Sequence, residues 1–254
     1  TAENISNDFK ISRQEQDKFA LESHKKATKA IESGIFAEEI IPIYNDDKKS
    51  AMIDEDEGVR KKQSIKDLEK LKPYFDRISG SVTVGNSSQV TDGAAFVLLM
   101  SEQVAKKLQK QYDFEILGYL TDFAYAGMDP SRMGLGPVFA TKKLFDKTGK
   151  KLDQMDLIEI NEAFAAQVIG CKKAFADKEF CKKNFNMSEP FGKIDDKILN
   201  VNGGGVALGH PVGMSGTRII IHALRELKRR KKKTALATLC VGGGQGGACL
   251  LELK

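Results

Sequence analysis

The chain has 254 residues, of which 41% are hydrophobic and 30% are charged, and its formal net charge at pH 7 is +5. This composition is ordinary for a soluble globular protein, and the length suits one large domain or two modest ones. No apolar run approaches the roughly 18 residues that a membrane-spanning helix needs, and a charge of this size does not by itself indicate a nucleic-acid partner.

The four cysteines show neither a CxxC pair nor a regular spacing. They are Cys171, Cys181, Cys240 and Cys249. This pattern argues against a disulfide scaffold and against a zinc site, and it favours reduced thiols in a cytoplasmic or mitochondrial-matrix location. The chain opens at Thr1 with neither an initiator methionine nor a signal or transit pattern, which we interpret as the start of a fragment.

The first ninety or so residues are predicted to be mostly helical and polar. Ser12 and Glu15 form a capping-box pattern before apolar residues at helical spacing, and Gly34 is expected to end that helix. A charged loop is expected at residues 45–57. Ser64 then begins a second helix, which ends at Pro73.

From residue 81 onward, strands are predicted to alternate with helices. The predicted strands are residues 81–84, 94–100, 114–125, 157–160, 198–201, 234–240 and 248–253. The predicted helices are residues 101–108, 137–149, 161–175 and 215–230. Buried strands that alternate with helices indicate an α/β layered architecture, and the short connection between the last two strands predicts an antiparallel hairpin.

Three short stretches lie where a strand meets a turn or a helix, a common location for the active sites of α/β proteins. They are NEAF at residues 161–164, NGGGVALGHPVGMSG at residues 202–216 and CVGGGQG at residues 240–246. Such a density of glycine indicates turns whose backbone N–H groups approach a ligand closely. The imidazole of His210, the thiol of Cys240 and the carboxamide of Asn161 suit thioester and enolate chemistry. We therefore predict that these three side chains converge on one reacting carbon.

Other candidates have simpler interpretations. Cys171 lies at helical spacing with apolar residues and is expected to belong to the core. His24 and His222 fall within helices and are expected to be structural or exposed. The lysine-rich run at residues 228–233 is expected to be a solvated helix end, because cations there complement the helix dipole. A single GGG turn is also more often a hairpin than a site, but packing alone does not explain the three stretches together.

The three stretches, in this order, resemble the C-terminal signature blocks of the thiolase family: NEAF, N-x-x-GG-x-x-A-x-GHP-x-G-x-SG and C-x-GGG-x-G. The likeness extends to TAEN and SRQEQDKFALESHKKA near the start of the chain, to GNSSQ at residues 85–89 and to MGLGP at residues 133–137. The resemblance therefore spans essentially the whole chain.

Membership of that family implies an α/β fold, the thiolase-like layered α/β/α/β/α arrangement. Here it would comprise part of the N-terminal half with its loop domain and a complete C-terminal half. The resemblance places a coenzyme-A-binding loop domain and its return segment at residues 1–90. A remnant of the N-terminal half would follow at residues 91–112, and the C-terminal domain at residues 113–254.

The resemblance also implies a reaction, either the reversible Claisen condensation of acetyl-CoA with an acyl-CoA or the thiolytic cleavage of a 3-ketoacyl-CoA. In that reaction His210 would be the base that activates a nucleophilic cysteine, and Cys240 would exchange the α-proton of acetyl-CoA. Asn161 would hold a water that forms one oxyanion hole with His210. The backbone N–H of Gly242 would contribute to the second.

By the same resemblance, seven residues match positions that contact coenzyme A or line its acyl and pantetheine pocket. They are Arg60, Leu71, Phe75, Val84, Ser88, Met133 and Phe164. The coenzyme A thioester is itself the substrate, so the family implies no metal and no redox cofactor. It also implies a homodimer or homotetramer, with neither a nucleic-acid nor a membrane partner.

Two features depart from the family pattern. The family's nucleophilic cysteine lies before the TAEN stretch, whereas no cysteine precedes Cys171 here. We therefore expect the nucleophile to lie in an N-terminal segment outside this sequence, and this chain alone to be unable to turn over substrate. The polar insert at residues 176–197, together with GNSSQ, favours a degradative 3-ketoacyl-CoA thiolase of broad chain length.

Three alternative interpretations remain open at the level of sequence. A non-catalytic acyl-CoA or lipid-binding relative would not need His210, Asn161 and Cys240 together. A basic nucleic-acid-binding module would depend on residues 228–233 alone. A condensing enzyme of the ketoacyl synthase type shares the fold but usually pairs its cysteine with two histidines, so the block at Cys240 fits a thiolase better.

Overall fold

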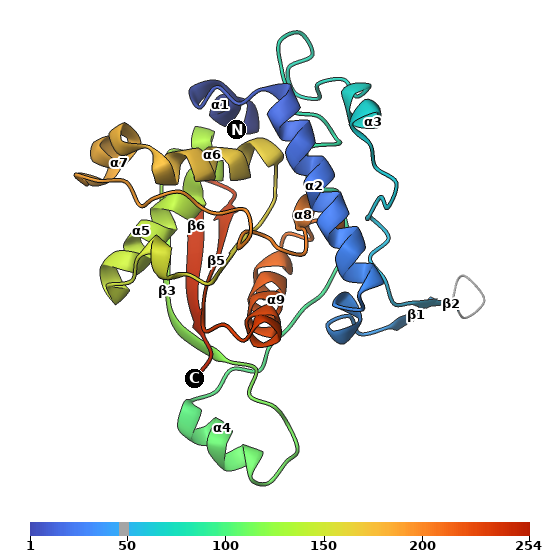
Figure 1. Cartoon of the computed structure of the whole chain (residues 1–254), viewed down its shortest axis with the longest axis vertical. Coiled ribbons are helices and arrows are strands. Elements are labelled where there is room, and N and C mark those ends of the chain that lie inside the picture. The colour runs from blue at the N-terminus through green and yellow to red at the C-terminus, as the bar shows by residue number, and fades with distance from the viewer. Residues whose placement is uncertain (46–50) are drawn as a thin grey trace.

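The computed structural model describes residues 1–45 and 51–254. Its centre is a mixed sheet whose strands are ordered β3 (Tyr119–Gly127), β6 (Gln245–Glu252), β5 (Thr234–Val241) and β4 (Leu157–Ile160). Strand β4 is parallel to β5, while β6 is antiparallel to both β5 and β3. Helices cover both faces of this sheet (Figure 1). The antiparallel hairpin predicted for the last two strands is confirmed.

The two faces of the sheet bury different side chains, because successive residues of a strand point to opposite sides. One face packs against α5 (Gly136–Thr148) and α6 (Ala165–Ala176). Its buried strand residues include Ile158, Ile160, Leu236 and Leu250. The other face packs against α9 (Ser215–Arg230). Its buried strand residues include Leu157, Ala235, Ala237 and Leu251. Both faces of the central strands are therefore covered, as the apolar character of the predicted strands required.

The N-terminal region packs beside the sheet rather than in it (Figure 1). Helix α1 (Ala2–Asp8) contacts α6, and α2 (Arg13–Glu32) lies against α6 and α8 (Gly205–Leu208). The capping box predicted at the start of α2 is present, since Ser12 Oγ accepts from the N–H of Glu15 and Glu15 Oε2 accepts from the N–H of Ser12 at 2.7 Å. Its buried face consists mainly of small and polar residues.

The remaining elements are short. They are η1 (Phe36–Glu38), β1 (Ile43–Asn45), β2 (Ala51–Ile53), α3 (Ile65–Glu69), α4 (Glu102–Gln109), η3 (Pro130–Leu135), η4 (Leu152–Gln154) and α7 (Lys178–Phe185). The helices predicted after Ser64, after Ser101 and at residues 137–149 and 215–230 are confirmed within a few residues. The loop predicted at residues 45–57 is partly wrong, because β1 and β2 pair antiparallel. Residues 46–50 of that prediction lie outside the described part of the chain.

Two predicted strands in the first half are wrong. At residues 81–84, the N–H groups of Ser81 and Val82 donate to the carboxylate of Glu3 instead of to a neighbouring strand. Residues 94–100 are extended but unpaired, and Phe96 and Leu98 are 81% and 82% exposed. A strand requires a partner for its backbone groups, and no described strand lies beside this segment.

Two predictions in the second half are also wrong in part. The expected strand at residues 198–201 is reduced to one parallel bridge between Leu199 and Ile158. Asn200 has a φ of +41° there, and its side chain bonds both the N–H and the carbonyl of Ile160, which replaces further backbone pairing. The helix expected from residue 161 begins only at Ala165.

No helix among the described residues is long and apolar enough to cross a membrane.

A contact between two glycines fixes the distance between α5 and β6. A Cβ atom on Gly246 would lie 2.1 Å from the carbonyl oxygen of Gly136, and one on Gly136 would lie 2.3 Å from the carbonyl oxygen of Gln245. No side chain fits at either position without a backbone shift. The start of α5 is therefore held directly against the strand that pairs with β5.

We predict that Gly246→Ala lowers the free energy of unfolding by about 1–3 kcal/mol, because overpacking against backbone forces the helix away from the sheet. Urea unfolding followed by circular dichroism measures this. The control is Gly127→Ala, whose Cβ would meet nothing within 4 Å. Equal changes in the two variants would contradict the steric explanation.

Candidate active site

The three predicted stretches meet near the edge of the sheet at which β4 and β5 end. Asn161 directly follows β4, and Cys240 is the penultimate residue of β5. In the parallel register Ile160 lies opposite Thr238, and the N–H of Asn161 donates to the carbonyl of Thr238 at 3.0 Å. Strand pairing therefore brings the carboxamide and the thiol to the same edge.

The Asn161 corner is extended and is held by the segment at residues 86–88. The N–H of Ser88 donates to the carbonyl of Ala163 at 2.9 Å, and the N–H of Ala165 donates to the carbonyl of Asn86 at 2.9 Å. These bonds use the backbone groups that a helix from residue 161 would have needed. The carboxamide of Asn161 is consequently fixed before α6 begins.

The His210 corner depends on a glycine with a left-handed backbone. Gly209 has a φ of +92°, and a Cβ there would lie 2.4 Å from Thr91 Oγ1. The N–H of His210 donates to the carbonyl of Gln89 at 3.1 Å. The backbone hydrogen bond to Gln89 therefore helps to position the imidazole, in addition to the hydrogen bonds of the ring itself.

The hydrogen bonds of the His210 ring define its tautomer. Ser215 Oγ donates its only proton to the carbonyl of Pro211 at 3.1 Å, so it accepts from Nδ1 of His210 at 2.6 Å. Nδ1 then carries the proton, and Nε2 presents a lone pair. That lone pair faces Nδ2 of Asn161 at 3.3 Å. The expected convergence of His210 and Asn161 is therefore present in the geometry.

Asn161 retains an unused acceptor at this point. Its Oδ1 atom is buried and receives no hydrogen bond from any described residue. A buried carbonyl oxygen without a donor is costly, and a bound water or ligand group is the usual remedy.

Burial lowers the pKa of His210 and raises that of Cys240, so both side chains are uncharged at neutral pH. It lowers the pKa of His210, and the positive charge of Arg218 lowers it further. Burial raises the pKa of the Cys240 thiol to about 11. At neutral pH the imidazole is therefore free to accept a proton, while the thiol holds one to give. Two groups whose environments drive their protonation in opposite senses are characteristic of an acid–base pair.

The third corner is a tight turn between β5 and β6. Gly243 and Gly244 have φ values of +84° and +86°, and Gly242 is exposed with nothing within 4 Å of the position of a side chain. Gly242 thus borders open space on its Cβ side. Among the described residues no hydrogen bond joins the Cys240 thiol to His210 or Asn161, so strand pairing alone brings Cys240 to this edge.

Five of the seven predicted coenzyme A residues lie in or are linked to the Asn161 corner. Phe75 stacks edge-on against Phe164 with ring centroids 6.2 Å apart, and Ser88 bonds the corner through its backbone. Leu71 packs beside Gly85 in the same segment as Ser88. Val84 follows in that segment and is 57% exposed.

No described interaction links the other two predicted coenzyme A residues, Arg60 and Met133, to the Asn161 corner. Arg60 is exposed, and its backbone N–H donates to Nδ1 of His24 at 3.1 Å. Met133 is half-buried in η3, which packs on α1, α5 and α6.

The sequence analysis missed three residues that hold this site. They are Ser215, Gln89 and Glu162. Ser215 sets the ring tautomer, and Gln89 bonds His210 from its carbonyl and Gly58 from its side chain. Glu162 is fully buried beside Asn161. Their position within or beside the glycine-rich stretches could have identified these three residues. An unreactive polar residue at such a place usually forms a hydrogen bond that orients a neighbouring residue.

The remaining histidines and the lysine-rich run are structural. His24 and His222 are both buried, and His222 Nδ1 lies 3.0 Å from the carboxylate of Glu39. Lys228 and Lys232 form ion pairs at the end of α9, as a solvated helix end would. Among the described residues no group of three or more histidine, cysteine or acidic side chains is arranged to hold a metal ion.

Comparison with protein families identifies matches over both parts of the chain. The model described as the N-terminal domain of thiolase matches residues 1–103, and that described as the C-terminal domain of thiolase matches residues 114–253. Among curated proteins, an acetyl-CoA acetyltransferase of Pseudomonas aeruginosa is 45% identical over 253 residues, and a 3-ketoacyl-CoA thiolase of Photorhabdus laumondii is 43% identical over 254. The alignments cover 99% of this chain but 59% and 61% of those proteins.

Solved structures give the same result. The acetyl-CoA acetyltransferase of Bacillus anthracis superposes with a TM-score of 0.87 at 41% identity, covering 99% of this chain and 58% of that one. Human mitochondrial 3-ketoacyl-CoA thiolase in complex with CoA superposes with a TM-score of 0.82 at 37% identity, covering 100% of this chain and 58% of that one. The fold is thus shared over the entire chain.

We predict that Ser215→Ala releases the ring of His210 from a single tautomer. Without the hydroxyl acceptor, Nδ1–H loses a bond of 2.6 Å, and the proton distributes between both ring nitrogens. Nitrogen-15 NMR of the imidazole measures the tautomer. Ser33→Ala, which removes an exposed hydroxyl at the end of α2, is the control. A ring that keeps its proton on Nδ1 in Ser215→Ala would show that the donor Nδ2 of Asn161, and not Ser215, sets the tautomer.

Proposed function

The chain belongs to the thiolase family, and from that membership we propose that its site serves acyl transfer between coenzyme A thioesters. The reaction is the thiolytic cleavage of a 3-ketoacyl-CoA or the reverse condensation of acetyl-CoA with an acyl-CoA. The curated relatives described above carry names for both directions. The chain spans about three-fifths of the length of these relatives, and their reaction is therefore proposed for it.

The observation that supports this proposal most strongly is the contact between His210 and Asn161. The imidazole, neutral and with its lone pair on Nε2, lies 3.3 Å from the carboxamide of Asn161. The Cys240 thiol, protonated because it is buried, lies at the adjacent strand end. A base, an acid and a hydrogen-bonding amide at one edge are the groups that thioester cleavage through an enolate requires.

In the proposed cleavage, His210 Nε2 takes the proton of a nucleophilic cysteine outside these residues. The resulting thiolate attacks the 3-keto carbon, and the bond between the α-carbon and that carbon breaks with its electron pair moving to the α-carbon. Cys240 gives its thiol proton to the α-carbon, which releases acetyl-CoA. A coenzyme A thiol then attacks the acyl-enzyme and gives its proton to the Cys240 thiolate. The bond from the acyl carbon to the nucleophilic cysteine breaks, and that cysteine recovers its proton from His210.

Two groups are proposed to hold the charge that develops on oxygen. After His210 is protonated, its Nε2–H donates to the enolate oxygen, and a water bound to Asn161 donates beside it. The unpartnered Oδ1 of Asn161 supports this role, because it offers an acceptor for one proton of such a water. The N–H of Gly242, an exposed residue, is proposed to serve the second oxyanion, on the acyl carbon.

Coenzyme A is proposed to lie against the surface formed by Leu71, Phe75, Val84 and Ser88, with Phe164 at its inner end. The stacking of Phe75 on Phe164 links this surface to the Asn161 corner. Arg60 and Met133 are proposed as outer contacts. In the complete enzyme we propose a homodimer or homotetramer.

The nucleophilic cysteine of the reaction is proposed to lie outside these residues. No cysteine occurs among residues 1–170, and the cysteines that follow are Cys171, Cys181, Cys240 and Cys249. Cys171 and Cys181 are fully buried, and burial raises the pKa of both. Neither provides a ready thiolate. This chain alone is therefore proposed to bind coenzyme A without turnover.

We predict that this chain produces no acetyl-CoA from acetoacetyl-CoA and coenzyme A above the uncatalysed rate. Chromatographic quantification of acetyl-CoA measures this. Turnover at the rate of a complete thiolase would contradict the need for a nucleophile outside these residues.

We predict that the same chain binds coenzyme A, and that Phe75→Ala weakens binding by about tenfold because a stacked aromatic contact is lost. Isothermal titration calorimetry measures the affinity. Phe96→Ala, which removes an exposed ring outside the predicted surface, is the matched control. Unchanged affinity in Phe75→Ala would place the coenzyme elsewhere.

A further inference from the structure

Glu162 forms a buried carboxylate node beside the site. Its side chain is 1% exposed and accepts three hydrogen bonds. Ser23 Oγ donates at 2.6 Å, Asn200 Nδ2 at 2.9 Å and the N–H of Val206 at 3.2 Å. The donors lie in α2, in the segment after the bridge at Leu199, and in the first turn of α8. One carboxylate thus joins three distant parts of the chain.

The backbone is shaped to admit this carboxylate. A Cβ on Gly204 would lie 2.5 Å from Cδ of Glu162, and one on Gly205 would lie 2.7 Å from its carbonyl oxygen. The N–H of Gly204 also donates to Ser23 Oγ at 3.2 Å. The two glycines are therefore required for close approach, and they begin the segment that leads through α8 to His210.

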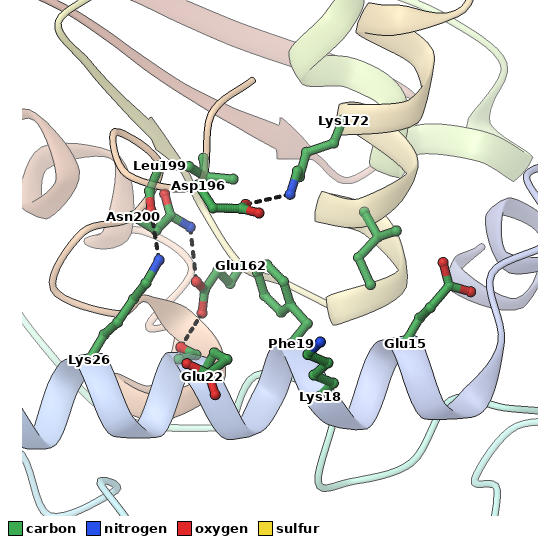
Figure 2. A pocket seen from close by; sticks show the side chains of 12 residues that line it. Glu15, Lys18, Phe19, Glu22, Lys26, Glu162, Lys172, Asp196, Leu199 and Asn200 are labelled. Atoms are coloured by element: carbon green, nitrogen blue, oxygen red, sulfur yellow. Dashed lines mark hydrogen bonds and ion pairs between the residues drawn. The ribbon is translucent and has the colours of Figure 1, made fainter. Parts of the chain in front are cut away.

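A pocket of about 460 Å³ lies on the α2 side of this node (Figure 2). It is bounded by α2, α6 and the segment at residues 196–200, and Figure 2 shows Glu162 pointing toward Asn200 and α2. Lys26 on its wall donates to the carbonyl of Leu199 at 3.0 Å. The carboxylate thus faces α2 and the pocket wall, whereas the preceding residue, Asn161, faces His210.

Burying the carboxylate of Glu162 costs desolvation free energy, which argues that this residue has a specific role. Burial raises the pKa of the Glu162 carboxyl, and the hydrogen bonds from Ser23, Asn200 and Val206 oppose that rise. An apolar side chain of similar size would fill the same volume without a desolvation penalty. An apolar side chain would not, however, fix the positions of the three donors.

We propose that Glu162 is a positioning residue that holds Asn161 and the segment leading to His210 in one geometry by binding both to α2. The inference rests on the proposed function for its meaning, since it concerns the orientation of the base and of the carboxamide beside it. Glu162 itself does not touch the reacting atoms. It acts through Asn161, its neighbour in sequence, and through Val206 at the start of α8.

The test is Glu162→Gln in the chain as it stands, examined by NMR. The amide has the same shape, but its NH₂ group must face a donor, either Asn200 Nδ2 or the N–H of Val206. We expect the side-chain amide signals of Asn161 to shift and the titration midpoint of His210 to rise, because a hydrogen bond that Asn161 Nδ2 donates to Nε2 of the neutral ring would be lost. Hydrogen exchange at the N–H of Val206 should accelerate by about tenfold.

Glu22→Gln is the matched control, because Glu22 lines the same pocket but is paired with Lys25 at the surface. It should change none of these signals. A merely structural role for Glu162 would lower the melting temperature of Glu162→Gln and leave the Asn161 and His210 signals in place, which would overturn the proposal.

Ser23→Ala removes one donor and keeps the carboxylate, so it provides the test if Glu162→Gln fails to fold. It should produce the same shifts in smaller measure, and a folded Ser23→Ala with unchanged Asn161 and His210 signals would also overturn the proposal. None of these measurements depends on coenzyme A. If the wild-type chain does not bind coenzyme A, the proposed function fails while the positioning test can still succeed.

Discussion

The parallel pairing of β4 with β5 determines where every candidate reactive group can lie. With Ile160 opposite Thr238, Asn161 and Cys240 leave the sheet at the same edge. The hairpin from β5 to β6 then places the Gly242 turn at that edge, and α9 brings the segment containing His210 across one face of the same strands. A shift of one residue in this register would turn the thiol of Cys240 to the opposite face of the sheet.

Burial at this edge does more than exclude solvent. The same loss of water that keeps His210 unprotonated keeps Cys240 protonated, because each group is pushed toward its uncharged form. Burial is the main influence on both groups, and the positive charge of Arg218 adds to it at His210. The neutral state of both side chains also means that the first proton transfer creates a charge pair inside the site, where the carboxamide of Asn161 and the hydroxyl of Ser215 are already oriented.

Sequence reasoning predicted the layered α/β fold and the convergence of Asn161 with His210, because strand ends and glycine-rich turns follow from local patterns. It failed where a side chain replaced backbone pairing. Asn200 ends a strand by bonding Ile160 through its own amide, and no periodicity in residues 198–201 signals this. It also failed at residues 94–100, a continuous apolar run that favours a strand but that pairs with no described strand. Local sequence patterns do not indicate a role for Glu162, since its donors are separated from it by 38 to 139 positions.

The carboxylate of Glu162 also couples the packing of three separate parts of the chain. It loses its hydration only when α2, the Asn200 segment and α8 have all arrived, and a partial arrangement leaves a charge facing apolar surroundings with too few donors. Docking of α2 is therefore coupled to the placement of the Asn200 segment and α8. The segment that leads to His210 consequently depends on contacts with the first thirty residues of the chain.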